Sequence, residues 1–512
     1  MDDVRYRLAE DVDYPSVRAA VAVVAPVEDG PETTIPVTWL DTFDWRLWRA
    51  GCRLSLEGTP QQRRLVVVRS GASPWVLPVS RTPRRATDLP EGDLRDALAP
   101  LIENRALIPV GSLRVERRLL RVVDDEGNGR ARLWWETAAA GDEAADETSI
   151  RLDAIPGEER LADGLRAALE SSFELAPTAA DGLDLAAAAG GRTPGDYSTR
   201  PAIHLERDEP AAESLGRILG VLHEVAVANV DGVLADVDVE FLHDLRVATR
   251  RARSALSQLK GVAEGEIVAS LRDELRWLQG LTGSCRDLDV WLEEIPALVA
   301  LLPEAQRPAL SALERHVRDA RRNELRRVRR GLRSERFERL LATWAEVSSD
   351  PPAGPRGPAP IGEVADDRIA RAHRRILKKG RAIDDGSPAE ALHRLRIDAK
   401  KLRYLLELLG SLYDGDAAGR FVRRLKKLQD LLGEHNDRSA QRERLHRFAA
   451  EMVDGGAARA DTLLAMGRLE GELTRLQRRL RADFARTFGS FSGPKATTAF
   501  KAMLARDAGE PA

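Results

Sequence analysis

Cysteine is nearly absent from this sequence, which holds only Cys52 and Cys285 in 512 residues. Two thiols exclude a disulfide framework and a four-thiolate metal site. Aromatic residues make up 5% of the chain, while alanine, leucine and arginine recur, which favours helices over an all-β fold. No run approaches the ~18 apolar residues of a membrane span, and the first residues lack the pattern of a signal peptide. We therefore expect a soluble, cytoplasmic protein.

Lysine is absent from the first 200 residues, which hold 25 arginines and 34 acidic residues. Residues 201–512 have the opposite balance, with 54 basic and 48 acidic residues. So small an excess does not by itself require a polyanionic partner. What decides the question is whether the positive charge gathers on one face of the fold.

The first 175 residues have the pattern of an antiparallel β-sheet. Short β-branched, aromatic or alternating runs are separated by turn residues, as in strands joined by hairpins. Residues 14–24 and 158–175 have a helical pattern instead. The predicted strands cover residues 34–40, 64–69, 75–79, 112–123 and 131–135.

The pattern then changes to long amphipathic helices. A stretch rich in Ala, Gly, Asp and Pro precedes them and predicts a linker. Five prolines within residues 349–360 cannot continue a helix, so the helical region has two halves with a stiff connection. We predict an α+β multidomain protein, with a barrel-like antiparallel domain at 1–178, a linker at 179–206 and an all-α domain at 207–506 whose halves are 207–348 and 361–506.

The two helical halves repeat one sequence at an offset of 150 residues. The segment that begins at His243 (HDLRVATRRAR) aligns with the segment that begins at His393 (HRLRIDAKKLR), and every basic position of the first is basic in the second. Solenoid repeats are shorter and come in larger numbers, so we predict two copies of a bundle of about four helices. The same offset pairs Arg276 with Lys426, Gln279 with Gln429, Asp287 with Asp437, and His223 with His373.

On a helical wheel, each copy gathers its basic residues on one side, opposite a row of Leu and Ala. Each helix is therefore expected to pack its apolar side into a bundle and to present aligned positive charge elsewhere. The first stripe is His243, Arg246, Arg250 and Arg253, flanked by Arg251. The second is His393, Arg396, Lys400 and Arg403, flanked by Lys401.

These stripes carry like charges three and four residues apart, which repel by a few tenths of a kcal/mol per pair. An arginine-rich composition can produce one such stripe by itself, but its repetition in both halves favours an anionic partner. Arginine forks bind phosphate oxygens in a bidentate manner. No aromatic residue lies among the stripe positions, which argues against nucleic-acid bases as the ligand. A polymer of phosphate without bases needs none.

The doubled motif resembles the defining motif of the CHAD family, the conserved-histidine α-helical domain. Residues 283–291 (GSCRDLDVW) and 433–440 (GEHNDRSA) are similar to a later motif of that family. The resemblance covers about residues 205–506. It implies two pseudo-symmetric four-helix bundles around a basic channel that binds inorganic polyphosphate, with some members located on polyphosphate granules. The contacts that it implies are His243, Arg246, Arg250, Arg251, Arg253, Arg276, His393, Arg396, Lys400, Lys401, Arg403, Lys426 and Lys427.

The histidines have a second interpretation, as metal ligands. Metal sites need convergent neutral histidines or carboxylates, whereas His243 and His393 are crowded by Arg and Lys, whose charge repels a cation. We therefore predict neither a metal nor another cofactor. We interpret His223 and His373 as hydrogen-bonding core residues.

Residues 40–47 (LDTFDWRL) resemble the CYTH family, the triphosphate tunnel fold, a closed antiparallel barrel that often precedes CHAD. Active members of that family begin with a Glu-x-Glu-x-Lys strand that binds catalytic metal, and residues 3–7 (DVRYR) match it here. Arg5 replaces the second carboxylate, and Mg²⁺ needs clustered carboxylates. The resemblance thus implies a degenerate barrel without triphosphatase activity. An active site would still require Asp3, Glu116, Glu136 and Asp153.

We accordingly predict a non-catalytic protein that binds polyphosphate in its helical domain, with no membrane partner. Arg250, Arg251, Lys400 and Lys401 are expected to contribute most of the affinity. Two alternatives remain. One is a metal-dependent triphosphatase or polyphosphate hydrolase that uses the N-terminal barrel, and the other is a nucleic-acid-binding helical protein.

Overall fold

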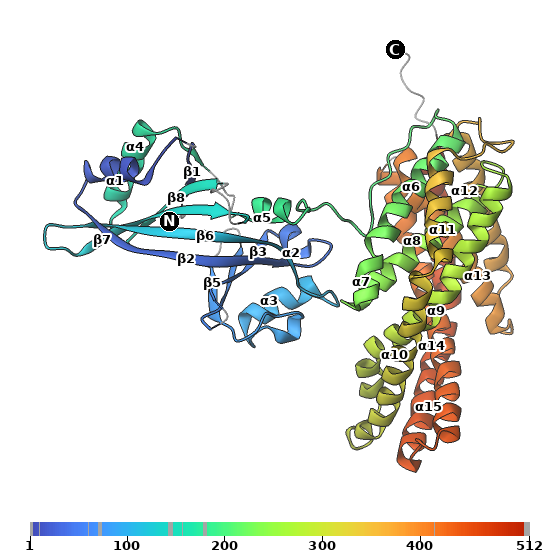
Figure 1. Cartoon of the computed structure of the whole chain (residues 1–512). Coiled ribbons are helices and arrows are strands. Elements are labelled where there is room, and N and C mark those ends of the chain that lie inside the picture. Colours follow the sequence, from blue (N-terminus) through green and yellow to red (C-terminus); the bar gives the residue numbers. More distant parts are fainter. Residues whose placement is uncertain are drawn as a thin grey trace. The chain divides into compact units, whose positions relative to one another are not determined.

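The computed structural model divides into two compact units, Met1–Thr199 and Arg200–Ala512 (Figure 1). An α+β unit is followed by an all-α unit, so the predicted fold class is confirmed. The residues that the structure describes are 4–9, 11–59, 61–69, 74–141, 147–155, 157–177, 182–413 and 415–505.

The first unit is built on one nine-stranded sheet in which all neighbouring strands are antiparallel. The end strands β5 and β9 do not pair with each other among the described residues, so the sheet is antiparallel as predicted but not a closed barrel. In the order β5-β4-β3-β2-β6-β7-β8-β1-β9, the strands are Trp75–Pro78, Arg64–Arg69, Cys52–Glu57, Val27–Asp41, Ile108–Val123, Gly129–Ala139, Glu147–Ala154, Val4–Arg7 and Ala176–Pro177.

Helices cover parts of this sheet where alternating apolar residues need burial. The helices α1 (Tyr14–Ala22) and α4 (Glu159–Ser172) bury side chains against β6 and β7, at the two places where the sequence predicts helices. The helix α3 (Asp93–Ile102) covers a second apolar cluster. A four-residue helix, α2 (Arg46–Arg49), follows β2.

The predicted linker is partly folded. Residues Leu183–Ala189 form the helix α5, whose Leu183, Ala186 and Ala187 are buried against the sheet beside Trp39. Gly111 makes this contact possible, because a Cβ atom there would lie 2.1 Å from the carbonyl oxygen of Ala186. The close approach of α5 to β6 depends on one glycine, which composition alone does not indicate.

The second unit contains twelve α-helices in its described residues, six in each half of the repeat. The repeat is visible in their bounds, because α8 and α13 begin and end 150 residues apart. The first half comprises α6 (Ala211–Ala228), α7 (Val230–Ala235), α8 (Val239–Gln258), α9 (Glu266–Ala300), α10 (Ser311–Leu332) and α11 (Glu335–Ser349). The second comprises α12 (Ile361–Arg381), α13 (Ala389–Leu408), α14 (Gly415–Asp454), α15 (Ala460–Ala482), α16 (Phe484–Ser492) and α17 (Pro494–Leu504).

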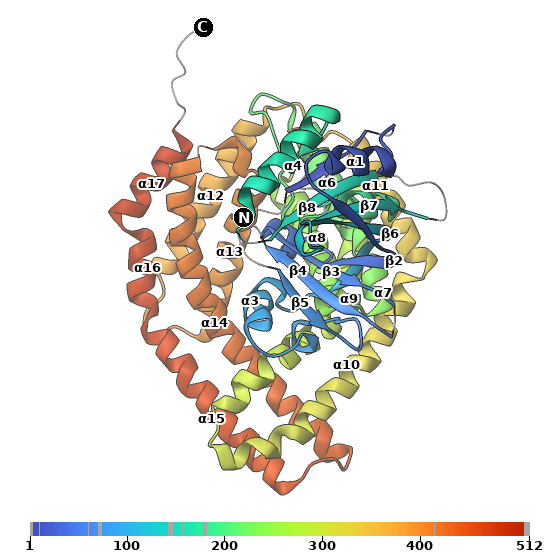
Figure 2. The same cartoon turned by 90° about the vertical axis from the view of Figure 1, so that its left-hand side faces the viewer.

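Four helices of each half form the predicted bundle. In the first half these are α6, α8, α9 and α11, which pack on one another in a closed ring. Figure 2 shows the corresponding bundle of α12, α13, α14, α16 and α17. Its last member is split in two because Pro494 follows Gly493 and supplies no backbone donor to continue the helix.

One segment corrects an expectation from the sequence. Residues Ala211–Ala235 are long and apolar enough to cross a membrane by length and composition. Within this unit, α6 buries Leu215, Ile218, Leu219 and Leu222. An apolar core helix passes the same test as a membrane span.

The two halves are related by a pseudo-two-fold axis. Pro210 forms an isolated antiparallel bridge with Pro360, its own equivalent at the 150-residue offset. The flanking hydrogen bonds are reciprocal: Ala211 donates to the Ala359 carbonyl and Ile361 donates to the Glu209 carbonyl, each at 2.9 Å. A two-fold axis passes between two equivalent residues that pair with each other, so the axis passes through this bridge.

The long helices α9 and α14 continue past the bundles and pack with α10 and α15 (Figure 1). An apolar core fills this extension, with Trp291 and Phe448 in edge-to-face contact at 5.4 Å between ring centroids. This core joins helices of both halves.

His373 lies in an aromatic core. Its ring stacks on Phe500 at 3.8 Å between centroids and also contacts Phe421 and Phe491. Burial, with the charges of Arg374 and Arg381, lowers its pKa to about 4. The other predicted core histidine, His223, packs edge-to-face on Trp344, and burial lowers its pKa as well.

This burial predicts a pH-dependent stability. The unfolded state takes up a proton near pH 6.5 and the folded state only near pH 4, so stability falls as pH drops through that window, by up to about 3 kcal/mol. His373→Phe is expected to reduce that loss, measured by urea unfolding at pH 7.5 and pH 5. His446→Phe, which replaces an exposed ring, should keep the wild-type loss. An equal loss in both variants would show that His373 is not responsible.

Candidate anion-binding site

The basic helix α8 is held by its apolar side and by its start. Asp238 caps the helix, accepting hydrogen bonds from the backbone N–H groups of Glu240 and Phe241 at 2.8 and 3.3 Å. Leu245, Ala248 and Ala252 are buried in the bundle. The opposite face of α8 is thereby directed toward α13 of the other half.

The two basic stripes share one cavity of about 500 Å³. Fifteen residues line it, and fourteen of them form seven pairs at the 150-residue offset, so the cavity is centred on the pseudo-two-fold axis. The pairs are Arg246 with Arg396, Arg250 with Lys400, Arg286 with Asn436, Asp287 with Asp437, Val290 with Ala440, Trp291 with Gln441, and Glu294 with Arg444; His243 is the fifteenth.

Positive charge is in excess in this cavity, whose lining holds six Lys or Arg residues against three carboxylates. Burial, together with Arg396 and Arg250, lowers the pKa of Lys400 to about 8. Burial also lowers the pKa of Arg246, with the charges of Arg250 and Arg286 acting in the same direction. The folded protein therefore holds cations at a cost that an anion would relieve.

Two hydrogen-bond donors in the cavity residues are unused. The buried Nε atoms of Arg250 and Arg396 have no hydrogen-bond partner within the described residues. An unsatisfied buried donor costs about 1–3 kcal/mol, so these two arginines add to the cost at which the free protein holds its cavity cations. Arg246, in contrast, is positioned by hydrogen bonds of 2.8 Å to the Gln279 carbonyl and to Thr282 Oγ1.

Five of the thirteen predicted binding residues line the cavity: His243, Arg246, Arg250, Arg396 and Lys400. His393 lies beside it, with its Nδ1 atom in a hydrogen bond to Asn436. The backbone carbonyl of Lys401 accepts a hydrogen bond from Gln258.

The other predicted residues lie outside the lining. Arg251 pairs with Glu407 of α13 at 3.1 Å, and Arg403 pairs with the same carboxylate group at 2.6 Å. Burial lowers the pKa of Arg253, and the nearby positive charge of Arg276 lowers it further. Arg276 itself pairs with Asp273, and Lys426 and Lys427 are exposed on α14.

Sequence reasoning missed two cavity cations, Arg286 and Arg444. Arg286 could have been predicted, because it is adjacent to Asp287, which the repeat pairs with Asp437. Arg444 could not have been predicted from the repeat, because its equivalent in the first half is Glu294. Arg444 pairs across the halves with Asp287 at 2.7 Å, and Gln441 donates to Glu294 at 2.6 Å.

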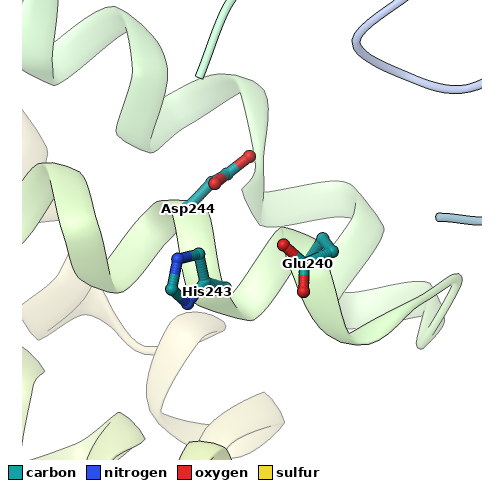
Figure 3. A group of neighbouring side chains, drawn as sticks. All are labelled: Glu240, His243 and Asp244. Atoms are coloured by element: carbon teal, nitrogen blue, oxygen red, sulfur yellow. The ribbon is translucent and has the colours of Figure 1, made fainter. Parts of the chain in front are cut away.

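A possible set of metal ligands lies at the start of α8. Glu240, His243 and Asp244 each offer a ligand atom within 4.8 Å of the others. Figure 3 shows Asp244 pointing away from the His243 ring. Arg286 lies 3.9 Å from Glu240, so a guanidinium group competes for one of the three ligands. The donor set is therefore poorly suited to a cation.

The first unit has a separate cavity on its sheet, of about 150 Å³. Glu136, one of its lining residues, is 2% exposed and pairs with Arg5 at 2.7 Å and with Arg117 at 2.6 Å. Arg117 also pairs with Glu57, at 3.3 Å. The arginine and glutamate charges compensate one another, so among the described residues Glu136 and Glu57 are engaged by arginines.

The predicted catalytic carboxylates are not gathered there. Glu136 lines the cavity, whereas Glu116 and Asp153 do not. Asp153 pairs with Arg151 at 3.0 Å and accepts a hydrogen bond from the Trp134 indole. Asp3 lies outside the described residues.

Residues 217–446 match the CHAD domain family, and this part of the chain is a CHAD domain. Across 484 residues the chain is 27% identical to the uncharacterized protein Rv2226 of Mycobacterium tuberculosis, a match that covers 86% of this chain and 87% of that one. It is similar to the solved CHAD domain of Ricinus communis, with 26% identity and a TM-score of 0.49, covering 58% of this chain and 96% of that one. It is also similar to HpAC1 of Hippeastrum, described as having a dominant triphosphatase activity, with 12% identity and a TM-score of 0.29, covering 38% and 99%.

Proposed function

We propose that the helical unit binds inorganic polyphosphate in the cavity between α8 and α13, without a catalytic step. The observation that carries this proposal is the meeting of both basic stripes in one cavity whose lining holds six Lys or Arg residues against three carboxylates. Phosphate oxygens accept hydrogen bonds from guanidinium and ammonium groups and supply the missing negative charge. The cavity lining includes one aromatic residue, Trp291, which is 1% exposed and packed into the apolar core, so it offers no stacking surface for a base.

The test is a titration of the whole chain with linear polyphosphates of defined length at several salt concentrations. We expect binding that weakens steeply with salt, because the ligand and the cavity release counterions on association. Single-stranded RNA of matched charge should compete poorly. If RNA displaces polyphosphate readily, the nucleic-acid alternative replaces this proposal.

We further propose that the first unit has no triphosphatase activity and that the protein works in the cytoplasm, where polyphosphate granules are candidate locations. The compensated charges around Glu136 support the first part. Incubation with triphosphate and Mg²⁺ or Mn²⁺ is expected to release no more phosphate than the Glu136→Gln variant does. Release that this variant abolishes would establish the enzyme alternative.

A further inference from the structure

The symmetry of the cavity restricts the kind of ligand that it can take. Its four central cations form two pairs across the axis, Arg246 with Arg396 and Arg250 with Lys400. Each member of a pair is positively charged, so the charge pattern is nearly unchanged when the two halves are exchanged. A ligand that matches this pattern presents the same groups in both directions from its centre.

Contacts in the structure support the two-fold symmetry that the sequence repeat predicts. It passes through the bridge of Pro210 with Pro360. The contacts between α8 and α13 are also consistent with this axis. Arg251 of α8 contacts Glu407 of α13, and its equivalent Lys401 of α13 contacts Gln258 of α8, one residue away from the equivalent of Glu407. The cavity, lined by seven equivalent pairs, lies on the same axis.

We propose that the cavity holds an internal segment of a linear polyphosphate in either chain direction, with the segment's two-fold centre on the axis. This inference rests on the proposed function. An unbranched phosphate chain reads the same from both ends. A single nucleic-acid strand does not, because its sugars give it a direction.

The asymmetric lining residues do not select a direction. They are already engaged with protein groups: Arg444 pairs with Asp287, and Gln441 donates to Glu294. In the remaining charge-changing pair, Arg286 pairs with Glu293 at 3.3 Å and Asn436 is hydrogen-bonded to His393. Groups that satisfy one another contribute little to the choice between two ligand orientations. Among the central cations, Arg246 is held by the neutral oxygens of Gln279 and Thr282, and Arg396 lies 3.3 Å from the half-exposed Asp437, so neither is neutralised by a buried carboxylate partner.

The decisive experiment uses the unaltered chain. A short linear polyphosphate with a photoreactive group on one terminal phosphate is bound and irradiated, and the cross-linked peptides are identified by mass spectrometry. We expect cross-links on the α8–α9 side and the α13–α14 side in yields within about twofold, all competed by unlabelled polyphosphate. Cross-links confined to one side would overturn the two-direction inference while leaving the proposed function intact. Absence of competable binding by either ligand would instead overturn the proposed function.

A pair of substitutions gives an independent measurement. Arg250→Lys or Lys400→Arg alone places the same residue type at both equivalent positions. The double variant instead exchanges the arginine and the lysine between the two halves. We expect the double variant to bind unlabelled polyphosphate within about twofold of the wild type. A loss of tenfold or more in a folded double variant, with the cross-links on one side only, would show that the site distinguishes chain direction.

Discussion

Replacing Arg250 and Lys400 together with alanine is expected to weaken polyphosphate binding about 100-fold or more. A hydrogen bond to a charged group contributes about 1.5–3 kcal/mol, and the variant removes one cation from each half of the same cavity. The salt dependence should flatten too, because fewer counterions are released on binding. Isothermal titration calorimetry at three salt concentrations measures both effects.

The same variant should remain folded. Lys400 is held beside Arg250 and Arg396 at an electrostatic cost, so its removal relieves repulsion. The melting temperature is therefore expected to stay near that of the wild type. The matched control is Arg339→Ala with Arg486→Ala, which removes the same charge from side chains that are 70% and 79% exposed. If the control loses as much affinity as the cavity variant, net charge and not the cavity governs binding.

This choice of residues differs from the set that the sequence favours. The wheel places Arg251 and Lys401 beside the stripes, but the crossing of α8 and α13 gives Arg251 a carboxylate partner, Glu407. Which flank of a helix meets its neighbour depends on the crossing geometry, and a single-helix wheel does not contain that information. The stripe itself depends only on helical periodicity, and Arg246, Arg250, Arg396 and Lys400 were predictable from it.

The fold shows the same division between local and non-local information. The repeat predicted α8 and α13 in equivalent registers, because helical periodicity is encoded within a few residues. Whether the N-terminal sheet closes into a barrel was not predictable, since it depends on how strands far apart in the chain meet. The continuation of α9 and α14 into a second core with α10 and α15 is also non-local, because it requires apolar residues of both halves to come together.

Raising the pH from about 8 to 9.5 is expected to lower the affinity for long-chain polyphosphate by about tenfold. The free protein loses the Lys400 proton through this range, since its pKa lies near 8, whereas a bound polyanion favours the charged form and raises that pKa. Affinity should therefore be nearly constant below pH 7 and should decline above pH 8. Long chains are the proper ligand because their internal phosphates stay ionised throughout.

Lys400→Arg is the control that assigns this dependence to one group. An arginine keeps its charge across the range, so the variant should bind with nearly constant affinity from pH 7 to pH 9.5. The charged neighbours that face Lys400 are Arg396, Arg250, Arg403 and Asp437. A decline in the variant as steep as in the wild type would place the titrating group elsewhere and would remove Lys400 from the binding site. A flat variant beside a declining wild type would instead show that the ligand meets the ammonium group at the centre of the cavity, where the two repeats converge.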